Sequence, residues 1–241
     1  MRSKQISVII PTYNHSNFVI QAISSAERQS LKPIEIVVVN DGSPDNTDEI
    51  LTAYQGITYI KQSNTGAHEA INRGVAMAKS DYIAILNDDD IYDDDYLQQA
   101  IHSIDMHNSE FHLTIPRIFG QGFMWDAYQR HMKTSQFYIN KHGYLKALLK
   151  INWFISTSGI VMKKSHFEKI NGFRDYKLVH DWDFVLRSVF EKRARFSVSN
   201  LSTWSYRVHE SNSSLDIKKS IREVEETDIL KPYEHLISRL I

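Results

Sequence analysis

Residues 81–95 carry the densest group of side chains that could do chemistry, because seven of these fifteen residues are aspartates. Three interpretations are open: a solvated acidic loop, an EF-hand calcium loop, or a divalent-cation site at the end of a strand. An EF-hand fits poorly, since a loop starting at Asp88 would have Asp93 in the glycine position and Gln99 in place of the bidentate glutamate. The apolar run before the cluster favours a strand-end site, where carboxylates hold Mg²⁺ or Mn²⁺ and the ion in turn holds a diphosphate.

An aromatic and an acidic residue follow two earlier apolar runs. Tyr13 follows residues 6–10, and Asp41 follows residues 34–39. A tyrosine ring can stack on a nucleobase and a carboxylate can accept from a base N–H, although a tyrosine near Pro11 is also a common structural residue. No G-x-x-x-x-G-K-[ST] phosphate loop is present, so a metal ion held by aspartates would have to supply positive charge for nucleotide phosphates.

Four repeats of a short apolar run followed by a segment of helical period must position these residues. The pattern predicts an α/β fold with a mainly parallel sheet. Ser43 is the expected N-cap and Pro44 the expected first residue of the second helix. In an open parallel sheet the carboxyl ends of the strands form the ligand crevice, so the polar motifs should share one rim. The four strands are expected at residues 6–10, 34–39, 57–60 and 82–86.

The second half of the chain is less regular. Residues 111–150 have no clear period. We expect strands at residues 155–162 and 195–198, and a helix over residues 184–190 that follows His180-Asp181-Trp182-Asp183. A last helix begins near Ile217, with Ile217, Ile221 and Val224 at helical spacing, and breaks at Pro232.

Composition excludes several classes of protein. With 28 Lys and Arg against 29 Asp and Glu, the net charge is −1, and we expect no nucleic-acid partner. Cysteine is absent, so any metal must use oxygen or imidazole ligands. No run approaches the roughly 18 to 20 apolar residues of a membrane span, and Pro11 comes too early for a signal-peptide core. We therefore expect a cytoplasmic protein.

Seven motifs occur in a fixed order from about residue 6 to residue 214: SVIIPTYN, VVVNDGSPDNT, NTGAHEAINRG, YIAILNDDD, SGIVMKKSHFEKINGFRD, HDWD and YRVHESNSS. In this order they resemble family 2 glycosyltransferases, which are inverting nucleotide-sugar enzymes. The resemblance implies a GT-A fold, with a Rossmann-like sheet flanked by helices in one domain over residues 1–215. Residues 1–98 would form the nucleotide-sugar half and residues 99–215 the acceptor half, followed by a helical tail at residues 216–241.

The resemblance also assigns roles to particular residues. Asp181 matches the catalytic base of the family's E-D-x-D motif, and Asp89 and His209 match metal ligands. Trp182 would offer an apolar face to an acceptor sugar, although a helix N-cap with a buried Trp is the alternative for this segment. The residues assigned to the nucleotide sugar are Pro11, Thr12, Tyr13, Asp41, Asn64, Arg73, Asn87 and Asp88.

Two positions depart from the family pattern. Asn87 stands where the D-x-D motif has its first aspartate, and it adds no charge. Ile71 stands where many members have an arginine. Arg73 is a candidate replacement, but a helical residue two positions further on points elsewhere.

The implied activity is transfer of a sugar from a nucleotide-diphosphate sugar, with UDP as the default, to a hydroxyl of a glycan or lipid-linked acceptor. Mn²⁺ or Mg²⁺ would be the cofactor. The protein would act in surface polysaccharide assembly, in the cytoplasm or at the inner face of the membrane. The C-terminal tail has two interpretations: contact with a partner domain or membrane surface, or burial against the chain's own core, which we favour.

Two other functions compete with this one. A nucleotide-sugar-binding module without turnover is suggested by Asn87 and Ile71, whereas Asp89, Asp181 and His209 favour an enzyme. A nucleotidylyltransferase would show a glycine-rich basic signature near the N-terminus, which residues 6–14 lack.

Overall fold

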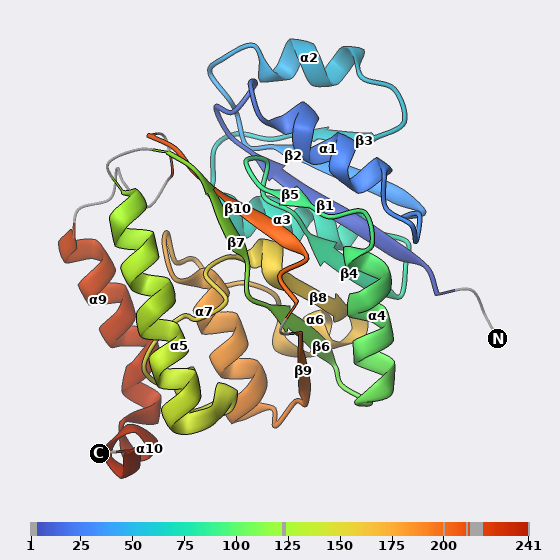
Figure 1. Ribbon diagram of the computed structural model, residues 1–241. Helices are drawn as coiled ribbons and strands as arrows, with labels where there is room; N and C mark the ends of the chain where they lie inside the picture. The colour runs from blue at the N-terminus through green and yellow to red at the C-terminus, as the bar shows by residue number, and fades with distance from the viewer. Residues whose placement is uncertain (1–3, 122–123, 200, 211, 213–218, 241) are drawn as a thin grey trace.

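The computed structural model describes residues 4–121, 124–199, 201–210, 212 and 219–240. A seven-stranded sheet in the order β3-β2-β1-β4-β8-β6-β9 forms its centre (Figure 1). Neighbouring strands run parallel except around β8, which is antiparallel to both β4 and β6. The strands are β1 (Ile6–Thr12), β2 (Glu35–Asn40), β3 (Thr58–Lys61), β4 (Tyr82–Ile85), β6 (Phe111–Thr114), β8 (Ile160–Lys163) and β9 (Phe196–Ser199). The predicted α/β fold with a mainly parallel sheet is confirmed.

Helices cover both faces of the sheet, which explains why its central strands are continuous apolar runs. On one face Val8, Ile10 and Val38 pack in one core cluster with α1 (Val19–Glu27) and α4 (Tyr96–Met106). On the other, Ile9 and Val37 pack in a second cluster to which several helices contribute. These are α3 (Ala67–Met77), α5 (Trp125–Ala147), α6 (Lys164–Ile170), α7 (His180–Leu186) and α9 (Lys219–Leu230).

Glycine allows α3 to lie directly on the sheet. A Cβ atom at Gly74 would come within 2.4 Å of Cγ2 of Ile9, closer than carbon atoms approach one another. The absence of a side chain at Gly74 therefore lets α3 pack closely against β1.

A small second sheet lies beside the carboxyl end of β4. Its strands are β5 (Ile91–Tyr92), β10 (Trp204–Val208) and β7 (Arg117–Gly120), with β10 in the middle. β10 runs antiparallel to β5 and parallel to β7. Because β5 directly follows the acidic loop, this sheet brings the end of β10 to that loop.

Several local expectations need correction. The four predicted strand and helix repeats are present, but α2 (Thr47–Ala53) begins three residues after Pro44, and Asp45 rather than Ser43 accepts from the Thr47 backbone N–H at 3.1 Å. The strand expected at 155–162 is confined to β8, preceded by a 3₁₀ turn at Thr157–Gly159. His180 to Asp183 form the first turn of α7, and Arg187–Glu191 continue it as a π-helix.

The C-terminal tail packs against the rest of the chain, as expected. Ile229 of α9 and Tyr233 are buried in the second core cluster. The helix predicted from the spacing of Ile217, Ile221 and Val224 is present as α9, although Val224 is 68% exposed. Ile217 and the 215/216 boundary lie outside the described residues. Beyond α9 the chain forms short helical turns at Lys231–Tyr233, Glu234–Ile237 (α10) and Ser238–Leu240. Among the described residues, no helix has the length and apolar character to cross a membrane.

Candidate active site

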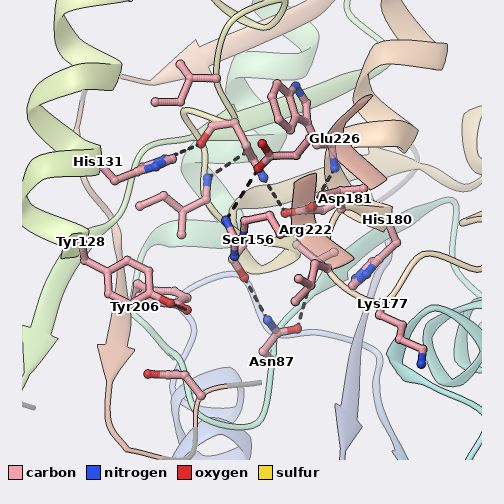
Figure 2. A pocket seen from close by; sticks show the side chains of 18 of the residues that line it. Asn87, Tyr128, His131, Ser156, Lys177, His180, Asp181, Tyr206, Arg222 and Glu226 are labelled. Carbon is pink, nitrogen blue, oxygen red and sulfur yellow. Dashed lines mark hydrogen bonds and ion pairs between the residues drawn. The ribbon is translucent and has the colours of Figure 1, made fainter. Parts of the chain in front are cut away.

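A cavity of about 570 Å³ lies where the acidic loop after β4 meets α7 and α9 (Figure 2). The loop contributes Asn87 and Asp89, α7 contributes Asp181 and Trp182, and α9 contributes Arg222 and Glu226. Segments more than a hundred residues apart in the sequence therefore line one space. One predicted carboxylate of the strand rim, Asp89, and one of the HDWD motif, Asp181, thus line the same cavity.

The loop after β1 contributes no residue to the cavity lining, and Tyr13 lies on its surface. Tyr13 is 45% exposed, which leaves ring surface for a base to stack on, whereas Pro11 and Thr12 are buried within β1. Asp41, at the end of β2, is buried. One of its oxygens accepts from the Thr65 backbone N–H at 2.9 Å, and the other from that of Gly66 at 2.8 Å. Asp41 therefore ties the turn before α3 to the end of β2.

Asn64 and Arg73, like Pro11, Thr12, Tyr13 and Asp41, lie outside the cavity lining. Asn64 and Arg73 are exposed, and an Arg73 Nη lies 3.4 Å from Oε1 of Gln62, whose amide also donates to Asp41. Arg73 is thus linked to the Asp41 group through Gln62. Ile71 is fully buried in the core, so no cation occupies the usual arginine position.

Asn87 is held by the segment before β8. Its backbone N–H donates to Ser158 Oγ and its amide to Ser156 Oγ, while it accepts from Thr157 Oγ1, all at 2.9 Å. An amide can donate and accept in this way, whereas a carboxylate can only accept. Asparagine therefore suits this position as a structural link between the acidic loop and the opposite wall.

Asp88 and Asp90 are buried and bonded to neighbouring protein groups. Asp88 accepts from the Tyr13 backbone N–H at 3.2 Å and lies 2.8 Å from His15 Nδ1. Asp90 accepts from Ser158 Oγ at 2.6 Å and from the Arg207 backbone N–H at 3.1 Å, and burial holds its pKa well above the usual range. Asp88 organises the loop after β1 and does not line the cavity, so its place among the nucleotide-sugar contacts stays a prediction.

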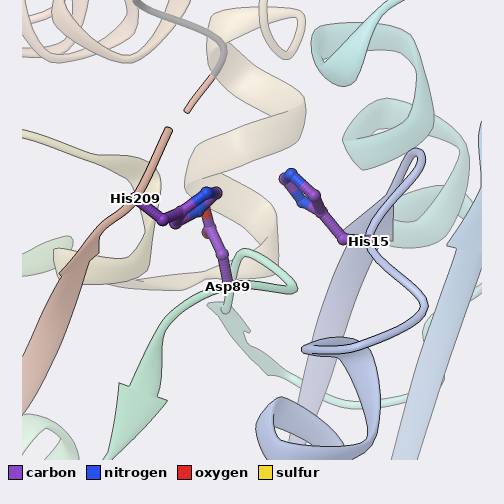
Figure 3. Close-up of side chains that lie close together, drawn as sticks. All are labelled: His15, Asp89 and His209. Carbon is purple, nitrogen blue, oxygen red and sulfur yellow. The ribbon is translucent and has the colours of Figure 1, made fainter. Parts of the chain in front are cut away.

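Asp89 and His209 meet as the metal-site expectation requires. His209 Nε2 lies 3.0 Å from Asp89 Oδ2, although the two residues are separated by 120 positions. His15 completes a group whose ligand atoms all lie within 4.8 Å of one another (Figure 3). Two imidazoles and a carboxylate are a donor set that a divalent transition metal accepts. The residues present therefore fit a divalent ion.

Asp181 is buried and lies in the wall of the cavity. Its side chain accepts from the Asn152 amide at 3.0 Å and from the Trp182 backbone N–H at 2.7 Å. Burial raises its pKa to about 6. A carboxyl group with a pKa this close to neutrality can accept a proton more readily than an ordinary aspartate.

The neighbours of Asp181 have other roles. Asp183 pairs at 2.8 Å with Arg187, and both side chains are buried. Burial lowers the pKa of His180 to about 4, so that imidazole is a weak base. Trp182 is only 4% exposed and its Nε1 donates to the Leu148 carbonyl at 2.8 Å, so it forms part of the cavity wall, and its contact with an acceptor sugar stays a prediction.

Sequence reasoning missed several residues of the site. His15 stands two positions after Tyr13, and its place after a predicted strand was the available signal. Asn152 and the α9 residues gave none, because Asn152 lies outside any regular element and α9 is placed by tertiary packing. Glu225 of α9 accepts from the backbone N–H groups of Lys177 and Leu178, both at 2.9 Å, just before α7.

Comparison with known proteins identifies the family. Residues 7–170 match the model of glycosyl transferase family 2, and the chain therefore belongs to this family. An uncharacterised glycosyltransferase of Rickettsia typhi is 41% identical over 107 residues, which cover 44% of this chain and 33% of that protein. Glycosyltransferase GlyG of Streptococcus pneumoniae is 33% identical over 107 residues, covering 42% of this chain and 36% of that protein. The chain thus spans about a third of the length of these curated relatives.

Solved structures show the same fold. TarS residues 1–349 from S. aureus, in complex with UDP-GlcNAc, superpose with a TM-score of 0.67 and 19% identity, covering 94% of this chain and 70% of that chain. The mannosyltransferase PcManGT from Pyrobaculum calidifontis, in complex with GDP-Man and Mn²⁺, superposes with a TM-score of 0.65 and 16% identity. The match covers 87% of this chain and 58% of that chain. The predicted GT-A fold is confirmed.

Proposed function

We propose that the chain is a metal-dependent inverting glycosyltransferase with Asp181 as its catalytic base. One observation carries the proposal: the buried carboxyl of Asp181 and the metal-ligand candidate Asp89 line the same cavity. A base and a site for a diphosphate must lie on either side of a reacting sugar, and a shared cavity meets this requirement.

The reaction proposed is a single displacement. Asp181 takes the proton from an acceptor hydroxyl while that oxygen forms a bond to the anomeric carbon of the donor. The bond from the anomeric carbon to the diphosphate breaks, and the nucleoside diphosphate leaves with the electron pair. Because the attack is opposite to the leaving group, the anomeric configuration inverts.

Asp89 and His209 would hold the divalent ion. Bound there, Mn²⁺ or Mg²⁺ would supply positive charge for the leaving diphosphate. PcManGT was solved with Mn²⁺, which supports the assignment for a fold relative. Asp90 and Arg207 fix the acidic loop around these ligands, since the Arg207 guanidinium donates to the Asp89 carbonyl at 2.8 Å.

The proposed donor is a UDP-sugar and the proposed acceptor a hydroxyl of a glycan or lipid-linked saccharide. TarS in complex with UDP-GlcNAc supports the uridine base, whereas the GDP-Man complex of PcManGT represents the alternative. We propose surface polysaccharide assembly as the setting. Tyr13 would stack on the base, with Asp41 at its edge.

A donor-hydrolysis screen over UDP- and GDP-sugars with Mn²⁺ tests this proposal. We expect one donor class to be cleaved to nucleoside diphosphate faster than in buffer alone. Tight donor binding without cleavage or transfer to any saccharide would instead favour the non-catalytic binding module. Absence of both binding and cleavage would contradict the proposal as a whole.

Tyr13→Ala should weaken nucleotide binding by about 1 to 3 kcal/mol, the usual contribution of a base stacked on an aromatic ring. Calorimetry with UDP measures the affinity, and circular dichroism confirms that the variant is folded. The conservative variant Tyr13→Phe serves as the control and should bind as the parent does. An unchanged affinity in the alanine variant would leave Tyr13 with a structural role only.

The pH dependence of turnover should report Asp181. Its carboxyl must be ionised to accept a proton, and its pKa is about 6. The value of kcat/KM should therefore be level above about pH 7 and fall about tenfold per unit below pH 6. Initial rates of donor cleavage give the profile, and Mn²⁺ binding over the same pH range separates loss of the metal from protonation of the base. A level profile down to pH 4.5 would contradict the assignment.

A further inference from the structure

His15 occupies a position that the metal-site assignment from the sequence left unused. It lies in the loop after β1, with its imidazole facing Asp89 and His209 (Figure 3). The ring centroids of His15 and His209 are 5.3 Å apart. Three separate segments, namely the loop after β1, the loop after β4 and the residue after β10, thus direct ligand atoms to one point.

The orientation of the His15 ring is fixed by Asp88. His15 Nδ1 lies 2.8 Å from Asp88 Oδ1, and the Asp88 side chain is only 7% exposed. A carboxylate on one ring nitrogen holds an imidazole in the tautomer that presents the other nitrogen, Nε2, to a metal. Pairs of this kind are the usual outer shell of metal-binding histidines.

Asn212 contacts the second imidazole. Its amide nitrogen lies 3.1 Å from His209 Nε2 and 3.3 Å from Asp89 Oδ2, and its amide oxygen accepts from the His209 backbone N–H at 2.8 Å. Phe18 packs against both histidines, with ring centroids 5.8 Å from His15 and 4.8 Å from His209. The three candidate ligands therefore belong to a constrained cluster on folded elements.

We propose that His15 is a third protein ligand of the divalent ion and that Asp88 is its positioning residue. The inference rests on the proposed function, because it concerns the ion that Asp89 and His209 would hold. With two imidazoles and one carboxylate, the site should favour a transition metal such as Mn²⁺ over Mg²⁺, which prefers oxygen ligands. Positions left open on the ion would receive the diphosphate oxygens of the donor.

Asp88 also links this ion to the nucleoside loop. The carboxylate that faces His15 accepts from the Tyr13 backbone N–H through its other oxygen. The base-stacking residue and the third ligand are thus held by one side chain, two residues apart in the sequence. Binding of the metal should therefore strengthen binding of UDP, and the reverse, by the same factor.

Titration of Mn²⁺, followed by the electron paramagnetic resonance signal of the free ion, tests the proposal without any turnover. We compare the parent chain with His15→Ala and with Asp88→Asn, both with and without UDP. His102→Ala, which removes an exposed histidine of α4, is the matched control. We expect His15→Ala to weaken Mn²⁺ binding by at least about 10-fold, Asp88→Asn to weaken it by a smaller factor, and the control to leave it unchanged.

The outcomes separate this inference from the proposed function. If the parent binds Mn²⁺ and His15→Ala binds it equally well, His15 is not a ligand, while the Asp89 and His209 site stands. If the parent binds no Mn²⁺ even with UDP, the proposed metal dependence fails together with this inference.

A measurement on the parent alone covers the case in which His15→Ala does not fold. Pulsed electron resonance of the Mn²⁺ complex detects coordinated imidazole nitrogens. The proposal requires two such nitrogens, and a complex with only one would overturn it. Competition between the two ions in the parent should show tighter binding of Mn²⁺ than of Mg²⁺.

Discussion

Asp181→Asn is expected to bind UDP and Mn²⁺ as the parent does and to lose transfer by about 10² to 10⁴-fold, the usual contribution of a general base. The variant is nearly isosteric, and its single amide oxygen can keep one of the two hydrogen bonds that Asp181 accepts from Asn152 and from the Trp182 backbone, which go to different carboxylate oxygens. It also removes a buried carboxyl whose charged form is disfavoured, which offsets the lost hydrogen bond, so its melting temperature at neutral pH should stay close to that of the parent. Calorimetry, donor cleavage rates and thermal melting supply the three readouts.

Asp183→Asn is the matched control for this prediction. Asp183 pairs with buried Arg187, which also donates to the carbonyls of Ile170 and Gly172. Breaking a buried pair by removing one partner costs about 3 to 5 kcal/mol, so this variant should melt at a lower temperature. The folded fraction of Asp183→Asn should still transfer the sugar at the rate of the parent. Full activity in Asp181→Asn together with inactivity in folded Asp183→Asn would move the catalytic base to Asp183.

Asp89→Asn should abolish the Mn²⁺-dependent part of the thermal stabilisation by UDP. Ligand at about 100 times its dissociation constant stabilises the folded chain by about 2.7 kcal/mol, and the variant loses the charged ligand of the metal. Thermal melting with UDP alone, Mn²⁺ alone and both together separates the two contributions. We expect the parent to show a larger shift with both ligands than the sum of the separate shifts.

Asp94→Asn provides the matched control within the same acidic segment. Asp94 is exposed and lies 3.4 Å from Arg28 in a surface ion pair, an interaction that contributes little to stability. Its melting behaviour should follow that of the parent at every ligand concentration. A Mn²⁺-dependent shift retained in Asp89→Asn would show that the ion binds elsewhere.

The meeting of Asp89 and His209 shows how much of the site the sequence predicted. The strand-end rule places the acidic loop at the rim of the sheet, because parallel strands direct their carboxyl ends to one edge. The placement of His209 came from the family resemblance, and no local pattern in the sequence brings it there. The structure accounts for the meeting through β10, which pairs with β5 directly after the acidic loop.

Other features depend on tertiary packing that a single sequence does not encode locally. Trp182 is an example, because its type is suited to contact with a sugar ring. In the structure its N–H donates to the Leu148 carbonyl and its ring packs in the second core cluster. The helix α5 includes Gly143 at a positive φ of 76°, which interrupts the helical period of its sequence. The helix was therefore not predicted from residues 111–150. Ile229 in the core and the bonds of Glu225 to Lys177 and Leu178 hold α9 beside the cavity, and helical spacing alone did not indicate these contacts.

The anomeric configuration of the sugar released from the donor tests the central claim most directly. Proton NMR, recorded during hydrolysis of a UDP-α-sugar and before the free sugar equilibrates, distinguishes the two anomers. With water in place of the acceptor and Asp181 removing its proton, the account predicts that the β-anomer is released first, and that Asp181→Asn releases it far more slowly. Initial release of the α-anomer would contradict the single displacement and, with it, the role assigned to Asp181.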